Sequence, residues 1–522
     1  MQVLKLEELS IEQKLGQLLI VRGYKDQEDK EYVLEMARKK AVGGIQVLFR
    51  DGYREEIREL QETAGYPVLV YADMERGFPK GQKIPSAMAL AAVNDLSVAY
   101  EAARVTAIEA KEAGLNAICG PVVDISCPGA LCKVNRTFGD DTAKVSAFGC
   151  AMIRGYQDEG LLVMAKHYPG GSDMVDDPHI REGLSLLDEQ QMEEKDLVPY
   201  IDAIKKENLS GIMTGHVVFP KIDPVYPATL SKKHLDIIRK HGFEGLAITD
   251  SLAMMGICRK YGERAPIGMA VAAGHDMVLP SYRLSYKEAY EALVESYHQG
   301  VFTEEQVDAA VGRIIEAQKK SLKKASAEKL TQEQKDLMQA LCQKVICPVT
   351  QKGIPLALDK DSKKLFVLLA ENSYPALGEN AQEIRTEGFY GMNQALKNKE
   401  LILSHFPDAE VIIIQEFPNT PQFERVCDRA NHCDDVVFFT FNRGGSYVGS
   451  EELTKRVEYL IETLMGKLAA IVHIGNPYAV ERFQHTRRLL LGFAPGECEE
   501  YAVKALAGEY TPNYPLPVSF RK

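Results

Sequence analysis

The stretch "KHYPGGSDMVDDPH", residues 166–179, concentrates side chains that can move protons and bind oxygen-rich ligands. It is too polar for a core strand and too rich in glycine for a stable helix, so it predicts a strand end that runs into a long loop. Asp177 stands two residues before His179, where a carboxylate can orient an imidazole ring and stabilise its protonated form. The pair therefore predicts an acid–base catalyst; the competing interpretation of His179 is a solvated loop histidine.

Asp250, in "GLAITDSLAMMGI", is the strongest candidate for a nucleophile. A carboxylate at the tip of a strand can attack an anomeric carbon while neighbouring donors hold it in place. Such a displacement needs a partner that protonates the leaving oxygen and later activates water. Most glycosidases use a second carboxyl group, whereas this sequence offers the Asp177–His179 pair.

Eight short apolar runs must position these residues. They alternate with segments of helical period, and each is apolar on both faces, as is typical of buried parallel strands. The alternation predicts a parallel α/β fold, and eight runs favour a (β/α)8 barrel over a doubly wound sheet with two extra strands. The runs are "LLIVRG" from residue 18, "GGIQVLF" from 43, "VLVYADM" from 68, "AICGPVVDI" from 117, "LLVMAKHYP" from 161, "GIMTGHVVF" from 211, "LAITDSL" from 246 and "DMVLP" from 276.

Polar residues at the ends of five of these runs also favour the barrel. The carboxyl ends of barrel strands converge on one face, where barrel enzymes keep their active sites. In an open sheet the same ends would be spread along an edge. Any one of these residues could instead be a capping or solvated loop residue. The residues are Asp73, Asp124, Lys166, His167, His216 and Asp250.

A charged stretch, "KKSLKKASAEKLTQEQK" at 319–335, separates two halves of the chain. After it, apolar runs restart with "KLFVLLA", "EVIIIQEF", "DVVFFTFN", "LAAIVHIG" and "RRLLLGF". They predict a second, smaller α/β domain with an open parallel sheet. The loop "FNRGGSYVGS" lacks the lysine-serine ending of a phosphate loop and is interpreted as an ordinary strand-to-helix connection. The predicted division is a barrel at 1–325, a helical connector at 326–362 and a second domain at 363–522.

Composition narrows the functional class. The 522 residues carry a formal net charge of −12 without a basic stripe, which argues against nucleic acid and anionic membranes as partners. We find no signal peptide pattern and no apolar stretch near the roughly 20 residues that span a bilayer. Cys427, His432 and Cys433 lack a second ligand pair, so no metal or cofactor is expected. The cysteines are expected as thiols, and the protein as cytoplasmic.

Seven segments, taken in order, resemble glycoside hydrolase family 3, specifically its β-N-acetylglucosaminidase branch. Each segment alone would be weak evidence for the family, but all seven in order, at compatible spacing, are highly specific. With the opening helix segment "IEQKLGQLL", the resemblance extends through nearly the whole barrel. They are "YADMERG", "GPVVDI", "NRTFGDD", "KHYPG" followed by "DPH", "GHVVFPKIDPVYPATLS", "TDSLAM" and "AGHDMVLP".

The resemblance implies a TIM-like barrel followed by a C-terminal αβα sandwich, and a retaining double displacement. Asp250 would be the nucleophile and His179 the acid/base, with Asp177 tuning it. The substrate would be a terminal nonreducing N-acetyl-β-glucosaminide, from muropeptides or chitin, cleaved by a cytoplasmic monomer or homodimer without a cofactor. Lys166 or Arg136 could alternatively be only a structural ion-pair partner. The residues implied to bind the sugar are Asp73, Arg136, Lys166, His167, His216 and Met254.

Departures from the family pattern leave alternatives open. Gly171 and Ser172 stand where the family has a histidine and a glycine, Pro178 stiffens the acid/base loop, and Lys80 and Lys83 stand where an arginine is usual. An imidazole, unlike a carboxylate, does not repel phosphate, so a phosphorylase is one alternative. Another β-glycosidase specificity is a second, and a non-catalytic sugar-binding protein is a third, from a different class.

Overall fold

The computed structural model describes residues 1–128, 134–371, 390–442 and 452–521. These residues form two compact units. The first comprises Met1–Ala87 and Asp95–Met338, and the second comprises Met88–Asn94 and Gln339–Lys522. The division after residue 338 falls inside the predicted connector, whose own limits stay a prediction.

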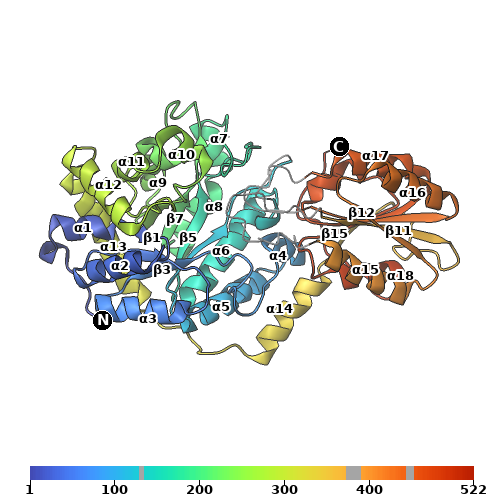
Figure 1. The fold of residues 1–522 in the computed structure, drawn as a ribbon, viewed down its shortest axis with the longest axis horizontal. Coiled ribbons are helices and arrows are strands. Elements are labelled where there is room, and N and C mark those ends of the chain that lie inside the picture. Colours follow the sequence, from blue (N-terminus) through green and yellow to red (C-terminus); the bar gives the residue numbers. More distant parts are fainter. Residues whose placement is uncertain (129–133, 372–389, 443–451, 522) are drawn as a thin grey trace. The chain divides into compact units, whose positions relative to one another are not determined.

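The first unit is built around a curled parallel sheet with the order β1-β2-β3-β4-β5-β7-β9 (Figure 1). The seven strands coincide with seven of the eight predicted runs, which confirms the α/β barrel-like architecture. Their bounds are β1 Ile20–Val21, β2 Gly44–Gln46, β3 Leu69–Ala72, β4 Ala117–Val122, β5 Leu162–Tyr168, β7 Gly211–Thr214 and β9 Leu246–Thr249.

The eighth run connects the two edges of this sheet without forming a regular strand. Met277 bridges Ile248 of β9, and Val278 bridges Leu19 beside β1, both in parallel. The backbone N–H of Val278 donates to Leu18 O at 2.8 Å, and that of Ile20 donates to Val278 O at 3.0 Å. The run therefore satisfies both edges and brings β9 and β1 to the same side of the site.

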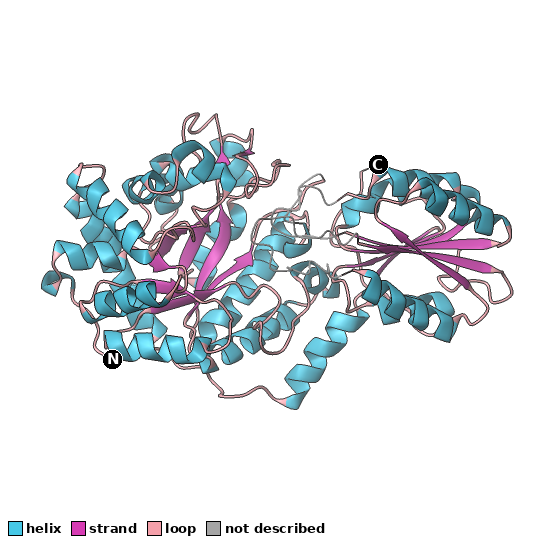
Figure 2. Cartoon of the chain, viewed as in Figure 1, coloured by secondary structure: helices cyan, strands magenta, loops and turns pink. Residues whose placement is uncertain are grey.

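Helices surround the strands of this unit (Figure 2). Several begin at side-chain caps that the sequence supplies: Ser285 and Glu288 form a capping box at α12, and Thr303 and Gln306 form one at α13. The helices are α1 Ile11–Gln17, α2 Gln27–Arg38, α3 Tyr53–Ala64, α5 Leu96–Glu112, α6 Thr142–Asp158, α7 Glu189–Glu194, α8 Val198–Glu207, α9 Lys232–Lys240, α10 Met255–Tyr261, α11 Ala265–Ala273, α12 Tyr286–His298 and α13 Glu304–Ser321. α14, Gln332–Lys344, crosses the division between the units, and α4, Ala87–Val93, lies almost wholly in the second.

Side chains of alternate strand positions fill the interior of the barrel. Tyr71, Cys119, Met164, Met213 and Ile248, from five different strands, belong to one buried cluster. Such a packed interior leaves the strand ends as the place where polar side chains can gather. A small separate sheet lies after β5 and β7, where β6 (Gly183–Leu184) pairs with β8 (Val217–Val218).

The second unit contains a six-stranded sheet with the order β10-β15-β14-β13-β11-β12. Five strands are parallel, as predicted, and their order along the sheet is that of a doubly wound fold. The prediction missed β10, which pairs antiparallel with β15 at the edge. The strands are β10 Cys347–Thr350, β11 Lys364–Ala370, β12 Glu410–Gln415, β13 Asp435–Phe441, β14 Leu468–Ile474 and β15 Arg488–Gly492.

Helices cover both faces of this second sheet, so it is an αβα sandwich (Figure 2). α15 (Met392–His405) and α18 (Glu499–Ala507) pack together on one face, and α16 (Thr420–Asn431) and α17 (Lys455–Thr463) lie on the other. Most of the predicted "FNRGGSYVGS" loop lies outside the described residues. Among the described helices, none combines the length and the apolar composition that a membrane crossing requires.

Candidate active site

Lys166 at the end of β5 ties the strand ends together. Its Nζ lies 2.6 Å from Asp73 Oδ1 and 2.9 Å from Glu75 Oε1, and the residue is only 2% exposed. Burial works to lower the pKa of Lys166, but Asp73 and Glu75 outweigh it and raise that pKa above its ordinary value. Lys166 is therefore a permanent cation that fixes the segment after β3 against β5.

Arg136 joins the same cluster through Glu75. Its Nε lies 2.7 Å from Glu75 Oε2, and its Nη2 lies 2.7 Å from Glu75 Oε1, a two-pronged pair of strong geometry. Burial would raise the pKa of Glu75, yet Arg136 and Lys166 hold it well below its ordinary value. Glu75 thus orients both cations. Glu75 belongs to the motif "YADMERG", but the motif alone did not predict this role.

His167 stands between two carboxylates. Its Nδ1 lies 2.8 Å from Asp124 Oδ2, and its backbone N–H donates to Asp124 Oδ1 at 3.2 Å. Its Nε2 lies 3.9 Å from Asp250 Oδ2. Burial lowers the pKa of His167 more than Asp124 raises it, so the ring is neutral near pH 7, with Nδ1–H directed to Asp124. Nε2 then faces the pocket on the side of Asp250.

Asp250 follows β9 directly, and backbone hydrogen bonds hold it. Its N–H donates to Thr214 O at 3.0 Å, and its Oδ1 accepts the Ser251 N–H at 2.6 Å. Burial works to raise the pKa of Asp250, but His167, His216, the Ser251 N–H and Lys166 together lower it to about 2. The carboxylate is therefore ionised at neutral pH, and its side chain remains 19% exposed.

His216 and Met254 lie beside the segment that carries Asp250. His216 is fully buried, with Nδ1 2.8 Å from Thr229 Oγ1 and Nε2 2.9 Å from Ser251 O. Both ring nitrogens of His216 are therefore hydrogen bonded to protein oxygens, and burial lowers the pKa of the ring. Met254 is buried and precedes α10, with its N–H donating to Ser251 O at 3.1 Å.

Asp177 and His179, predicted as an acid/base pair, are hydrogen bonded to each other. His179 Nδ1 lies 2.7 Å from Asp177 Oδ1, and the same oxygen accepts the His179 backbone N–H at 3.0 Å. The His179 side chain is 20% exposed, whereas that of Asp177 is buried. Burial lowers the pKa of His216, and the nearby His179 lowers it further.

Backbone hydrogen bonds dock this loop on the start of α10. Met255 N–H donates to His179 O at 3.2 Å, and Gly256 N–H donates to Pro178 O at 3.1 Å. A Cβ at Gly256 would lie 2.9 Å from Pro178 O, so glycine permits the close approach. The acid/base loop is thereby attached to the segment that follows Asp250.

The altered positions of the fourteen-residue stretch have their own anchor. The buried Asp196 accepts the Gly171 N–H at 2.9 Å and the Ser172 N–H at 2.8 Å through Oδ1. Its Oδ2 accepts the Ser172 hydroxyl at 2.9 Å. Gly171 has a φ of +118°, a conformation that L side chains rarely adopt. The two departures therefore build a fixed turn that starts the acid/base loop.

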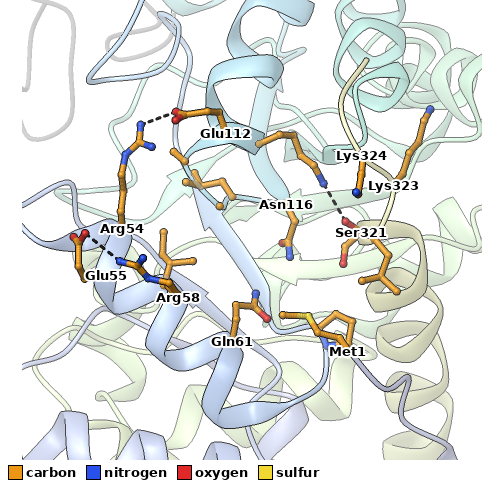
Figure 3. A pocket seen from close by; sticks show the side chains of 17 residues that line it. Met1, Arg54, Glu55, Arg58, Gln61, Glu112, Asn116, Ser321, Lys323 and Lys324 are labelled. Carbon is orange, nitrogen blue, oxygen red and sulfur yellow. Dashed lines mark hydrogen bonds and ion pairs between the residues drawn. The ribbon is translucent and has the colours of Figure 1, made fainter. Parts of the chain in front are cut away.

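A large cavity elsewhere does not belong to this site. It measures about 540 Å³ and lies at the amino-terminal ends of β3 and β4, between α3, the end of α5 and residues 321–324 (Figure 3). The residues discussed above lie at the opposite ends of the strands. Within the described part of the chain, no cluster of three or more histidine, cysteine or acidic residues could hold a metal ion.

Comparison with known proteins identifies the family. Residues 10–317 match the model described as "Glycosyl hydrolase family 3 N terminal domain". The chain belongs to glycosyl hydrolase family 3. This confirms the family that the sequence motifs indicated and, with it, the glycoside hydrolase class.

One curated protein illustrates the relatives to which this chain is similar. A Cellulomonas fimi protein named "Beta-N-acetylglucosaminidase/beta-glucosidase" is 31% identical over 329 residues, 59% of this chain and 57% of that protein. The chain therefore spans little more than half the length of this relative.

Two solved structures share the fold. A family 3 β-N-acetylglucosaminidase from Paenibacillus sp. str. FPU-7 has a TM-score of 0.81 and 24% identity, and the match covers 98% of this chain and 99% of that chain. A β-glucoside phosphorylase has a TM-score of 0.82 and 22% identity, with 98% and 95% covered. The barrel followed by an α/β sandwich is thus the fold of both structures.

Proposed function

We propose that this chain is an exo-acting, retaining β-N-acetylglucosaminidase that hydrolyses terminal nonreducing N-acetyl-β-glucosaminides. The observation that carries the proposal is the arrangement of Asp250, ionised at the end of β9, with the Asp177–His179 pair docked on the helix that follows it. A nucleophile and an acid/base delivered to one pocket are what a retaining displacement requires.

In the first step, Asp250 attacks the anomeric carbon and the bond to the leaving oxygen breaks. The protonated His179 gives its proton to that oxygen, and Asp177 stabilises the positive ring before the transfer. In the second step, the neutral His179 accepts a proton from water, whose oxygen attacks the anomeric carbon and releases Asp250. Two inversions give net retention of configuration.

The sugar itself would lie against the cluster on β3 and β5. Asp73 and His167 present an acceptor and a ring nitrogen, and Lys166 presents a charged donor at the same point. Arg136, oriented by Glu75, completes this edge. Charged groups in fixed positions suit the hydroxyl groups of a pyranose, which both donate and accept hydrogen bonds.

The relatives support the class of sugar without deciding between close alternatives. The name of the Cellulomonas fimi protein contains both an acetamido-sugar activity and a glucosidase activity. Phosphorolysis is the second candidate, because the imidazole of His179 would not repel an approaching phosphate anion as a carboxylate would. We further propose muropeptide- or chitin-derived oligosaccharides as the substrates and the cytoplasm as the location.

Hydrolysis of an aryl N-acetyl-β-glucosaminide and of the matching glucoside, each with and without phosphate, tests the proposal. Asp250→Ala and His179→Ala should abolish or sharply reduce turnover. His241→Ala is the matched control, because His241 also pairs with a carboxylate, Glu193 at 2.9 Å, but lies on the surface. Sugar 1-phosphate as the product would favour the phosphorylase. A folded protein that binds the sugar but turns over neither substrate would refute the enzyme.

A further inference from the structure

Arg22, the residue after β1, is a cation that pairs with no carboxylate among the residues that the structure describes. In the described part of the chain its guanidinium makes no hydrogen bond or ion pair, and the ring centroid of Tyr282 lies 5.8 Å away. Lys166 and Arg136, by contrast, are held by carboxylates at 2.6–2.9 Å. Of the cations that face the candidate active site, Arg22 is therefore the one whose donors the described residues leave unused.

Arg22 directly follows β1, Asp73 directly follows β3 and Asp250 directly follows β9, so all three lie at the carboxyl ends of the parallel strands, on one face of the barrel. Burial lowers the pKa of Arg22, and the fields of Asp250 and Asp73 oppose that shift, so both carboxylates lie within electrostatic range. Beside it, a cavity of about 150 Å³ is lined by residues that include Gly23, Leu48 and Tyr282. A partly buried guanidinium without hydrogen-bond acceptors is costly, and a ligand oxygen would relieve that cost.

We propose that Arg22 is a specificity-determining sugar-binding residue, which donates to the oxygen of a ring hydroxyl that itself donates to Asp73. This proposal rests on the proposed function, because it assigns a further contact to the same glycoside. A hydroxyl between a carboxylate and a guanidinium uses its proton and a lone pair at once. A sugar that is epimeric or deoxygenated at that carbon would leave both charged groups without a hydrogen-bond partner.

The charge balance favours a neutral hydroxyl over an anionic substituent. The cluster contains three cations and four carboxylates, so an added anion would increase the excess of negative charge. The cations are Arg22, Lys166 and Arg136; the carboxylates are Asp73, Glu75, Asp124 and Asp250.

Arg22→Met tests the assignment, since it keeps most of the length of the side chain and removes the donors. Arg283→Met is the matched control: Arg283 lies 4.8 Å from the same Tyr282 ring, but Glu263 pairs with it at 2.9 Å. We expect kcat/KM for aryl N-acetyl-β-glucosaminide to fall about 10- to 100-fold in Arg22→Met, mainly through KM, with no loss of Tm. Arg22→Lys should restore part of the loss.

Calorimetric titration with free N-acetylglucosamine separates this proposal from the proposed function. If the wild type binds the sugar without turnover, and Arg22→Met weakens that binding tenfold or more, the enzyme proposal fails and the Arg22 contact stands. Equal binding by wild type and Arg22→Met would overturn the contact, as would a wild type that binds no sugar. The loss of kcat/KM caused by Arg22→Met should disappear with a deoxy substrate that lacks the shared hydroxyl. We expect this for one of the 4-deoxy and 6-deoxy substrates and not for the other. Tighter binding of a sugar phosphate that depends on Arg22 would overturn the neutral ligand.

Discussion

Replacing Lys166 by Met should reduce both stability and activity. Removing one partner of a buried ion pair costs about 3–5 kcal/mol, because the other charge is left without compensation. Here Asp73 is 53% exposed, so water can solvate its charge, and Glu75 keeps both contacts with Arg136. We therefore expect a loss of about 2–3 kcal/mol in the free energy of unfolding, which lowers Tm by roughly 5–10 °C.

The effect on activity has a separate origin. Under the proposed function Lys166 Nζ would also donate to the sugar, so the variant would lose a charged donor to substrate, which is worth about 1.5–3 kcal/mol. This corresponds to a fall in kcat/KM of roughly 10- to 150-fold, measured with aryl N-acetyl-β-glucosaminide below the Tm of the variant.

Lys111→Met is the matched control, because it removes a half-buried lysine that also donates hydrogen bonds to the protein. Lys111 Nζ donates to Gly160 O at 3.2 Å and to Ser321 O at 3.0 Å, and Lys111 lines the cavity at the amino-terminal end of the barrel. This variant should keep full kcat/KM. An unchanged kcat/KM in Lys166→Met, or an equal loss in both variants, would refute the assignment of Lys166 to the sugar site.

Two further predictions follow from the same geometry. Asp177→Asn removes the charge that stabilises the protonated His179, so kcat should fall about 10²- to 10⁴-fold for a poor leaving group and less for an activated aryl group; equal losses for the two would contradict the acid role. Burial lowers the pKa of Lys111 to about 8, whereas an unfolded lysine titrates at about 10.4. The unfolded state thus binds more protons between these values, and stability rises with pH through this window. The free energy of unfolding, measured with denaturant, should therefore rise with pH more in the wild type than in Lys111→Met. We expect this difference to grow by about 1–2 kcal/mol across the window, after allowance for solvent screening. A difference that does not change with pH would contradict the prediction.

The sequence predicted the barrel because its strands are buried on both faces and keep a strong apolar signal. The prediction also placed Asp250, Lys166 and His167 at strand ends, because the point where a short apolar run stops marks the end of the strand. The antiparallel strand β10 gave no such signal: it has four residues, "CPVT", and one of them is proline.

The partners within the site could not be predicted in the same way. Glu75 contacts Arg136 across 61 positions of sequence, and Lys166 contacts Asp73 across 93. Whether two side chains meet over such separations depends on strand order and on how far each loop reaches. The sequence did not single out Arg22, because an arginine directly after an apolar run commonly marks only the solvent-exposed end of a strand. Its relevance came only from the closure that places β1 beside β9.

The proline in the acid/base loop illustrates how a departure can be accommodated. Pro178 stiffens the backbone between Asp177 and His179, which would hinder a loop that has to travel. In this structure the loop is already docked, because the carbonyls of Pro178 and His179 accept hydrogen bonds from the first residues of α10. A residue with fewer unfolded conformations then favours the docked state. The acid/base pair and Asp250 are thereby connected through one short run of backbone, and their separation depends on β9 and α10 more than on loop motion.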